Sequence, residues 1–210
     1  MCFTDKSCRD FAELLSGREP VPGGGGASAL VGALAAALGS MVGSLTVGKK
    51  KYADVQEEIE ALMGEAEHLR KELLQLVEED AKAFAPLAGA YGMPQNTEKE
   101  KQEKERVMEA ALQGASETPL AIMRKCCQII DLQREFAQKG SRLAVSDAGV
   151  GVIFAKSALQ GASLNVFINT KSMKNRESAE AFEREADQML LEYTAKADEI
   201  YADVCGLLRA

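Results

Sequence analysis

Three charged side chains are the strongest candidates for proton transfer in this sequence: Asp80, Asp147 and Lys49. Asp80 lies among alanines and a phenylalanine, and helical spacing places it on the buried side of its segment. A carboxylate in such a place is either a general base with a raised pKa or the partner of a lysine, and both interpretations stay open. Asp147 stands where a helix is expected to begin, so it is either a reacting group or a favourable charge at the helix N-terminus.

The second feature that could do chemistry is a run of four consecutive glycines: Gly23, Gly24, Gly25 and Gly26. Glycine has no Cβ, so such a loop can adopt positive φ and let another molecule approach its peptide groups closely. A helix that follows would add a positive potential, which suits a carboxylate, a phosphate or a carbonyl oxygen. The alternative is that the glycines merely turn the chain tightly. The run lacks a following Gly-Lys-Ser/Thr, which argues against a nucleotide-binding loop.

The segment 27–47 that follows the glycines has no charge and no proline, and its leucines recur at helical spacing. Its small residues fall on another face and predict a strip where a second helix packs unusually close: Gly32, Ala36, Gly39 and Gly43. We expect a fully buried central helix, either in an all-helical core or in a subunit interface. Its length would allow a membrane span, but its small residues partition weakly into hydrocarbon and no second such segment accompanies it. No membrane association is therefore expected.

A second helix, 147–169, is also rich in small residues and carries polar groups at both ends of one face. Asp147 lies at one end, and Asn165 and Asn169 lie at the other. Burying an amide costs free energy unless it is hydrogen-bonded, so each end is either a structural node or part of a binding site. In a straight helix Asp147 and Asn165 would lie about 27 Å apart. We therefore expect separate sites, or one site shared between subunits.

The whole chain fits an all-α fold, a multi-helix bundle organised around the central small-residue helix. We expect six or more helices and no strand, in a single domain spanning 1–210, because no proline- or serine-rich linker divides the chain. A long helix is expected to reach the region of Pro86 to Gly92 and to be followed by a loop at Met93-Pro94, and Thr118 with Pro119 predicts either a new helix or a kink. Further helix starts are expected at capping signals: Thr4 or Ser7, Asp54 with Glu57, Thr97 with Glu100, and Ser146.

The composition narrows the classes of function. The 25 basic and 32 acidic residues give a formal charge of −7, which argues against broad binding of nucleic acid or anionic membranes. The N-terminus has no apolar core of a signal peptide, so a cytoplasmic location is expected. Five cysteines without a CxxC pair, and the single His68, do not make a zinc site of ordinary composition. We expect reduced thiols and no metal.

Several short segments occur in an order that is typical of one family: Pro22 to Gly25, Met41-Val42, Leu45-Thr46, Lys49 to Tyr52, Asp80 to Phe84, Ser146-Asp147 and Asn165 to Asn169. The chain resembles the formiminotransferase-cyclodeaminase C-terminal family, which includes stand-alone methenyltetrahydrofolate cyclohydrolases. The resemblance covers nearly the whole chain. It implies an all-helical homodimer that acts on one-carbon adducts of tetrahydrofolate without a metal or other cofactor.

The resemblance also implies the chemistry. A cyclohydrolase adds water to the methenyl carbon, whereas a cyclodeaminase lets a folate nitrogen attack a formimino carbon and expels ammonia. Both pass through a tetrahedral carbon and need one group to take a proton and one to give it, for which Asp80, Asp147 and Lys49 are the candidates. The sequence does not choose between the two, although the lack of a fused transferase domain slightly favours the cyclohydrolase. The remaining alternative is a non-catalytic helical oligomeric scaffold.

Substrate binding is expected at the glycines, whose amides would receive the pterin or a carboxylate of the folate. Lys49 could instead hold the glutamate tail of the folate. The chain departs from the family at Gly26, where a serine is usual, and at Ser141, where an asparagine is usual. Further substrate contacts are expected from Ser28, Tyr52, Ser146, Asn165 and Asn169.

Overall fold

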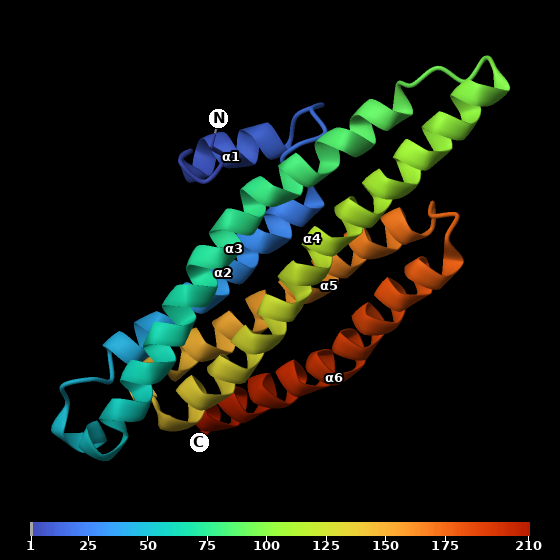
Figure 1. Ribbon diagram of the computed structural model, residues 1–210. Coiled ribbons are helices and arrows are strands. Elements are labelled where there is room, and N and C mark those ends of the chain that lie inside the picture. Colours follow the sequence, from blue (N-terminus) through green and yellow to red (C-terminus); the bar gives the residue numbers. More distant parts are fainter. Residues whose placement is uncertain (1) are drawn as a thin grey trace.

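The computed structural model describes residues 2–210, and this part of the chain forms an all-α bundle with no strand (Figure 1). The prediction of an all-α fold is confirmed. Two 3-10 helices, η1 (Lys50–Val55) and η2 (Arg142–Ala144), precede α-helices. The α-helices of the described residues are α1 (Cys8–Leu15), α2 (Gly24–Ser44), α3 (Gln56–Tyr91), α4 (Glu98–Lys139), α5 (Val145–Thr170) and α6 (Arg176–Arg209).

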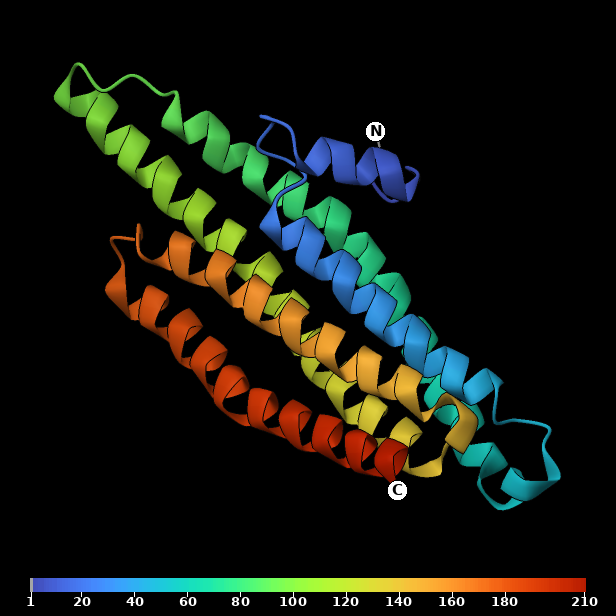
Figure 2. The same ribbon diagram turned by 180° about the vertical axis from the view of Figure 1, so that it is seen from behind.

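Helices α2 to α6 lie side by side along one long axis, and the short α1 lies outside them (Figures 1 and 2). The end of α3 and the start of α4 project together beyond the other helices (Figure 1). Helix α5 packs against α2, α4 and α6, and α2 also packs against α3. The first turn of α2 therefore lies between α3 and α5, where the candidate site is found.

The small-residue face of α2 is buried as predicted. Gly32, Ala36, Gly39 and Gly43 are all buried against neighbouring helices. A Cβ added at Gly39 would lie 2.8 Å from ring carbons of Phe136 on α4, closer than real Cβ contacts. Close packing of α2 thus depends on the absence of side-chain atoms along this face.

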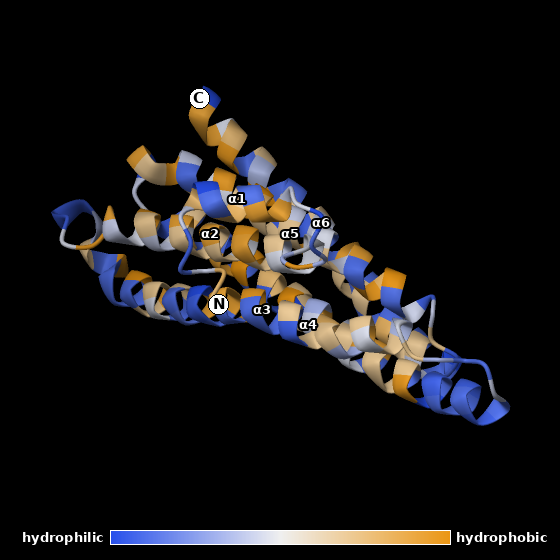
Figure 3. Cartoon of the chain, turned by 90° about the horizontal axis from the view of Figure 1, so that it is seen from above, coloured by the Kyte–Doolittle hydropathy of each residue, from blue (hydrophilic) through white to orange (hydrophobic). Residues whose placement is uncertain are grey.

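The opposite face of α2 is not buried within the chain, so burial of the whole helix in a single-chain core is wrong, whereas burial in a subunit interface stays a prediction. Leu34 and Met41 are each 48% exposed, because no other helix within residues 2–210 covers that side. Helix α5 continues the exposed surface with Leu164 and Ile168, which are 68% and 63% exposed. In Figure 3, α2 and α5 are coloured largely in hydrophobic tones, whereas hydrophilic colour follows the outer edge of α3 and α4. This apolar face of α2 and α5 is open within one chain.

The expectation that only one segment is apolar enough to span a membrane is wrong. By length and composition two helical stretches meet that description, Gly24–Ser44 and Arg142–Thr170. The bundle buries 56% of the apolar window of the first and 44% of that of the second. Core helices of bundles pass the same test, so the length and hydropathy of these two helices are weak support for a membrane span.

The long helix α3 ends at Tyr91, within the region 86–92 expected for its end, whereas the alternative of a new helix start at Thr118-Pro119 is wrong. Pro86 lies inside α3 and Pro119 lies inside α4, so the loop between these helices is confined to 92–97. An interior proline removes one hydrogen bond from its helix. Here the two long helices pack against each other and α4 also packs on α5, and these contacts keep each helix continuous through its proline.

The capping signals are only partly confirmed. Thr97 and Glu100 form the expected capping box at the start of α4. Asp54 and Ser146 do not cap α3 and α5, because η1 and η2 lead directly into these helices and move their starts to Gln56 and Val145.

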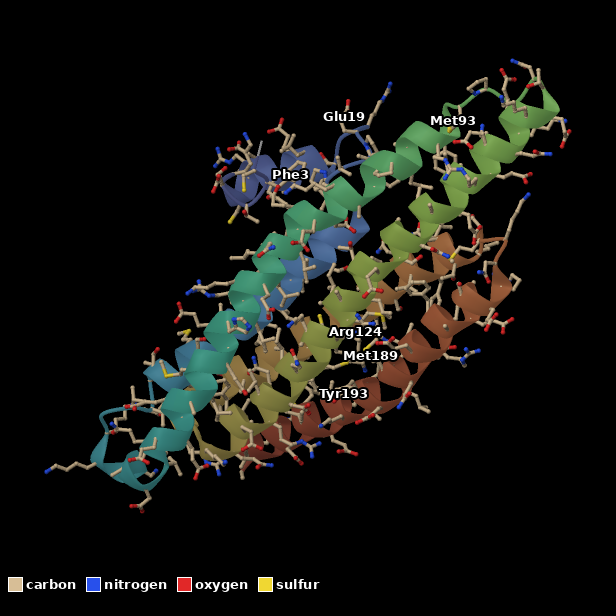
Figure 4. All side chains as sticks on the ribbon, viewed as in Figure 1. Phe3, Glu19, Met93, Arg124, Met189 and Tyr193 are labelled. Atoms are coloured by element: carbon tan, nitrogen blue, oxygen red, sulfur yellow. The ribbon has the colours of Figure 1, made fainter. Side chains whose placement is uncertain are left out.

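Polar contacts hold the N-terminal segment and α6 on the bundle, and Figure 4 labels Phe3 and Arg124, which take part in them. Glu78 on α3 accepts the backbone N–H groups of Phe3 at 2.6 Å and Thr4 at 3.0 Å. On the other side of the bundle Arg124 of α4 donates two hydrogen bonds to Glu185 of α6, at 2.6 and 3.0 Å. Such exposed ion pairs contribute about 0–1 kcal/mol each, so apolar contacts provide most of the attachment of α6.

Candidate functional site

The first turn of α2, the last third of α3 and the end of α5 enclose a cavity of about 160 Å³. Phe84 and Ile168 supply apolar walls, and Ala115 of α4 lines one side. The cavity brings together six of the predicted site residues, which supply its polar lining: Gly23, Gly24, Gly25, Asp80, Asn165 and Asn169.

Asp80 is the charged group of this cavity, and it lies on the inner side of α3 as predicted. Its carboxylate accepts the backbone N–H of Gly26 at 2.9 Å. Burial raises the pKa of the Asp80 carboxyl, and the hydrogen bond from Gly26 lowers it by less. No lysine or arginine of the described chain contributes to this shift. The interpretation of Asp80 as a proton-transfer group is therefore favoured over that of a lysine partner.

The glycines serve close approach and not positive φ. Gly23 is the N-cap of α2, and the next three glycines are already helical. A Cβ at Gly25 would overlap the carboxylate of Asp80, whereas one at Gly26 would make only ordinary contacts, the nearest at 3.6 Å. The expected glycine loop is thus the first turn of a helix. Only a glycine at position 25 lets the Asp80 carboxylate reach the N–H of Gly26.

Two hydrogen-bond donors of this turn remain available. The N–H of Gly26 is bonded to Asp80, and that of Ala27 to the carbonyl of Gly23. Within residues 2–210 no acceptor receives the N–H groups of Gly24 and Gly25. These groups lie at the positive end of the α2 dipole, where they favour an oxygen with negative charge.

The two asparagines of α5 present acceptors. The side-chain amide nitrogen of Asn165 donates to the carbonyl of Gly161 at 3.0 Å, and that of Asn169 donates to the carbonyl of Ala115 at 2.8 Å. Each nitrogen thus has one of its two N–H groups engaged, and no donor within residues 2–210 engages either amide oxygen, so the oxygens are left for the cavity. With Asp80 they make three acceptors beside two N–H donors, an arrangement that suits a flat polar ring edge carrying N–H groups and a carbonyl.

Ser28 does not reach the cavity. Its hydroxyl donates to the carbonyl of Gly24 at 2.7 Å, and the side chain is buried against Gly161. The hydroxyl is thus used within α2, and the predicted contact from Ser28 to a substrate has no support in its position.

The other predicted residues lie at the far end of α2 and α5. Helix α2 has 21 residues, which corresponds to a length of about 31 Å. Lys49 is exposed there and donates to the hydroxyl of Ser141 at 3.3 Å. Ser146 is exposed and Asp147 half-buried at the start of α5. The sequence-based expectation of two separate groups within one chain is confirmed.

Tyr52 belongs to this second group. Its hydroxyl accepts the backbone N–H of Arg142 at 3.1 Å, a bond that lowers the pKa of the phenol, with smaller contributions from Ser141 and the neighbouring lysines. The Ser141 N–H in turn donates to the Thr46 hydroxyl at 2.8 Å. These bonds fix the chain that joins α4 to α5, so Tyr52 has a structural role here.

Sequence reasoning missed the contribution of α4 to the cavity. The Ala115 carbonyl, which holds Asn169, is a backbone group and has no side-chain signature. Pro119 was the available signal, because an interior proline leaves the carbonyl four residues before it without a helical partner.

A larger hollow, of about 450 Å³, lies between α4 and α6 and includes Arg134, Arg142 and Asp203. Volume alone would favour it over the cavity at α2. The smaller cavity combines a carboxyl of raised pKa, free N–H groups and oriented amides, which are the features expected of a reactive site. We therefore place the candidate site at the first turn of α2.

Comparisons with known proteins agree with this fold. A solved structure of formiminotetrahydrofolate cyclodeaminase from Thermotoga maritima has a TM-score of 0.81 and 28% sequence identity to this chain. The match covers 98% of this chain and 97% of the other.

Similar sequences point the same way. A methenyltetrahydrofolate cyclohydrolase of Methylorubrum extorquens is 40% identical over 95% of this chain and 96% of its own length. The formimidoyltransferase-cyclodeaminase of Rattus norvegicus is 32% identical over 98% of this chain, which spans only 37% of that protein. The family model described as formiminotransferase-cyclodeaminase matches residues 7–188. The chain therefore belongs to the formiminotransferase-cyclodeaminase family.

Proposed function

We propose that this protein hydrolyses methenyltetrahydrofolate to formyltetrahydrofolate at the cavity beside the first turn of α2. The observation that carries the proposal is Asp80, a carboxyl of raised pKa that is held against a helix N-terminus with free N–H groups. The similarity to a methenyltetrahydrofolate cyclohydrolase along almost the full length of both chains supports this choice of reaction.

The polar groups of the cavity match the edge of a pterin. A pterin carries an amino group and a ring N–H beside a carbonyl oxygen. The amide oxygens of Asn165 and Asn169 would accept from the nitrogens, and the N–H groups of Gly24 and Gly25 would donate to the carbonyl. Bonds of this kind orient the reacting carbon toward Asp80.

Asp80 would then transfer protons. As a water oxygen bonds to the methenyl carbon, the carboxylate takes one proton from that water. The tetrahedral carbon then loses its bond to one nitrogen, which receives the proton from Asp80, while the new hydroxyl releases its proton to solvent and becomes the formyl oxygen. A group that both takes and gives a proton works best when its pKa is near the working pH, and burial moves Asp80 in that direction. No step is assigned to a metal or cofactor.

A cyclodeaminase is the second candidate. The likeness to the Thermotoga maritima cyclodeaminase favours it, since that chain and this one cover each other almost completely. The same cavity would hold a formimino adduct, and Asp80 would protonate the departing ammonia.

Both candidates are tested together. Purified protein is assayed for loss of methenyltetrahydrofolate absorbance above the spontaneous rate, and for ammonia release from formiminotetrahydrofolate. Asp80→Asn is compared with Glu79→Gln, which changes the neighbouring acid that bonds to Gln75 on the surface of α3. Hydrolysis that Asp80→Asn abolishes and Glu79→Gln preserves would support the proposal. Ammonia release would point to the second candidate.

The scaffold alternative makes a different prediction. Neither activity would be seen, and folates would not stabilise the protein against heat. A ligand that binds only the folded state adds about 2.7 kcal/mol at a hundred times its dissociation constant. A thermal shift with folate therefore separates an enzyme of unassigned reaction from a scaffold.

We also infer that two copies associate through the apolar face of α2 and α5 (Figure 3). Monomeric proteins rarely expose a continuous apolar surface of this kind. Exposed Ser44, Ser157 and Gln160 interrupt it, which fits a protein partner better than a hydrocarbon environment. A second copy would also allow Lys49, at the far end of α2, to contribute to the cavity of its partner, although it cannot reach the cavity of its own chain.

The association is tested with a matched pair of substitutions. Leu164→Glu places a charge in the apolar face, whereas Leu191→Glu changes a side chain of α6 that is 80% exposed and lies outside it. Sedimentation should show a dimer for the wild type and Leu191→Glu and a monomer for Leu164→Glu. A monomeric wild type would overturn the inference.

A further inference from the structure

Pro119 interrupts the hydrogen bonding of α4 beside the candidate site. A proline has no backbone N–H, so the carbonyl four residues earlier loses its helical donor. That carbonyl belongs to Ala115, which lines the cavity of about 160 Å³. The proline therefore leaves an unused acceptor at the wall of the site.

Asn169 of α5 fills this vacancy. Its amide nitrogen donates to the Ala115 carbonyl at 2.8 Å. A carbonyl can only accept, so the nitrogen end of the amide must face α4. The oxygen end of Asn169 is then the end left for the cavity, and no donor of residues 2–210 engages it.

Asn165 shows the same orientation with a different cause. Its amide nitrogen donates to the carbonyl of Gly161, four residues earlier in α5, at 3.0 Å. That bond lies within one helix and does not involve α4. The orientation of Asn165 should therefore not change when Pro119 is replaced, and Asn165 serves as the control for the role of the proline.

We infer that Pro119 is a positioning residue of the site, which makes Asn169 present an acceptor to the ligand. The ligand group that meets it is an N–H donor, such as a ring N–H or an amino group. This inference rests on the proposed function, because the amino and ring N–H groups of a pterin are the donors it would serve.

Substituting the proline should release the amide. In Pro119→Ala the new N–H competes for the Ala115 carbonyl, so the amide of Asn169 can turn and offer its nitrogen to the cavity. We expect KM for methenyltetrahydrofolate to rise about fivefold, as for loss of one oriented hydrogen bond, with kcat changed less than about twofold. Pro86→Ala removes the other interior proline of the long helices, which is exposed on α3, and should leave both constants unchanged.

A double-mutant cycle separates positioning from a general effect on the helix. If Pro119 acts through Asn169, adding Pro119→Ala to Asn169→Ala causes no further rise in KM. Adding it to Asn165→Ala raises KM by the same factor as in the wild type. Three outcomes would each overturn the inference. They are additivity in both pairs, an unchanged KM in Pro119→Ala, and a change of KM in Pro86→Ala equal to that in Pro119→Ala.

A second readout does not need a folate. In protein labelled with 15N-asparagine, the side-chain amide protons of Asn169 should exchange slowly and should exchange faster in Pro119→Ala. The Asn169→Asp variant assigns the signal. Exchange that is the same in both proteins overturns the inference. Faster exchange in a protein without folate turnover or binding would overturn the proposed function and leave the orientation by Pro119 standing.

Discussion

Both ends of α2 carry candidate residues, but these residues differ in burial. At the glycine end, Asp80 and the amides of Asn165 and Asn169 are half-buried, and each is held by a backbone group. At the other end, Lys49 is exposed on a turn of the chain and meets one serine hydroxyl at 3.3 Å. Reactive chemistry needs groups of fixed direction and shifted pKa, and Asp80 at the first end combines both at the wall of a cavity. The group with a shifted pKa at the second end, Tyr52, holds the chain that joins α4 to α5. The second end offers charge without fixed direction, which suits an anionic part of a ligand.

The largest effect should come from the glycine end. Asp80→Asn removes the proton-transfer group and should lower turnover by about 100-fold or more, while Asp147→Asn at the other end should change it by less than about threefold. Rates of both variants in the hydrolysis assay, with circular dichroism to check folding, measure the difference. Equal losses of turnover in the two variants would contradict the assignment of proton transfer to the glycine end.

Glycine substitutions separate the roles of two neighbouring residues within the first turn of α2. Gly25→Ala places a Cβ in the space of the Asp80 carboxylate and should destabilise the fold by about 1–3 kcal/mol. Gly24→Ala meets only Asn165 at 3.4 Å and should be neutral or slightly stabilising, since alanine favours a helix by about 1 kcal/mol. Urea denaturation of both variants gives the comparison. Equal stabilities would show that the carboxylate does not require this glycine.

The lysine end should affect binding and not the chemical step. Lys49→Ala is expected to raise KM by about threefold at low salt with little change in kcat, and added salt should reduce the difference, because an exposed charge is screened. Lys99→Ala, in the charged first turn of α4, is the control and should have no effect. A fall in kcat for Lys49→Ala would instead place its amine in the reaction.

The smallest effect should be a dependence of stability on pH. A raised pKa means that folded Asp80 binds its proton more tightly than the unfolded chain does. Its contribution to stability is therefore full below the unfolded pKa and is lost as pH rises through the folded pKa. The free energy of unfolding of Asp80→Asn relative to the wild type should increase as pH rises over that range. A difference that is constant with pH would show that Asp80 has no raised pKa.

The sequence predicts the elements well where the signal is local. The capping box of Thr97 and the small-residue strip of α2 both depend on residues within a few turns, and both are confirmed. The starts of α3 and α5 were misplaced because a 3-10 turn and a capping side chain leave similar patterns. The exposure of Leu34 was missed because spacing cannot tell how many neighbours a helix has.

The candidate site could be predicted only where it depends on the spacing within one helix. Helical spacing correctly placed Asp80 on the inner side of α3 and the two asparagines on one face of α5. It could not show that these faces meet at Gly24, because that depends on how three helices dock. The hydrogen bond from Asn169 to the Ala115 carbonyl could not be predicted for a related reason, because it depends on a proline of α4 and an amide of α5 together.

The hydrogen bonds that build the site have a consequence for folding. Gly26 and Asp80 are 54 residues apart in the chain, as are Ala115 and Asn169. Neither bond can close until separate helices have docked in register. A compact intermediate that keeps its helices but lacks fixed tertiary packing would therefore have a native-like helical spectrum and no site. Ligand binding reports on completed assembly of this protein, whereas helix content does not.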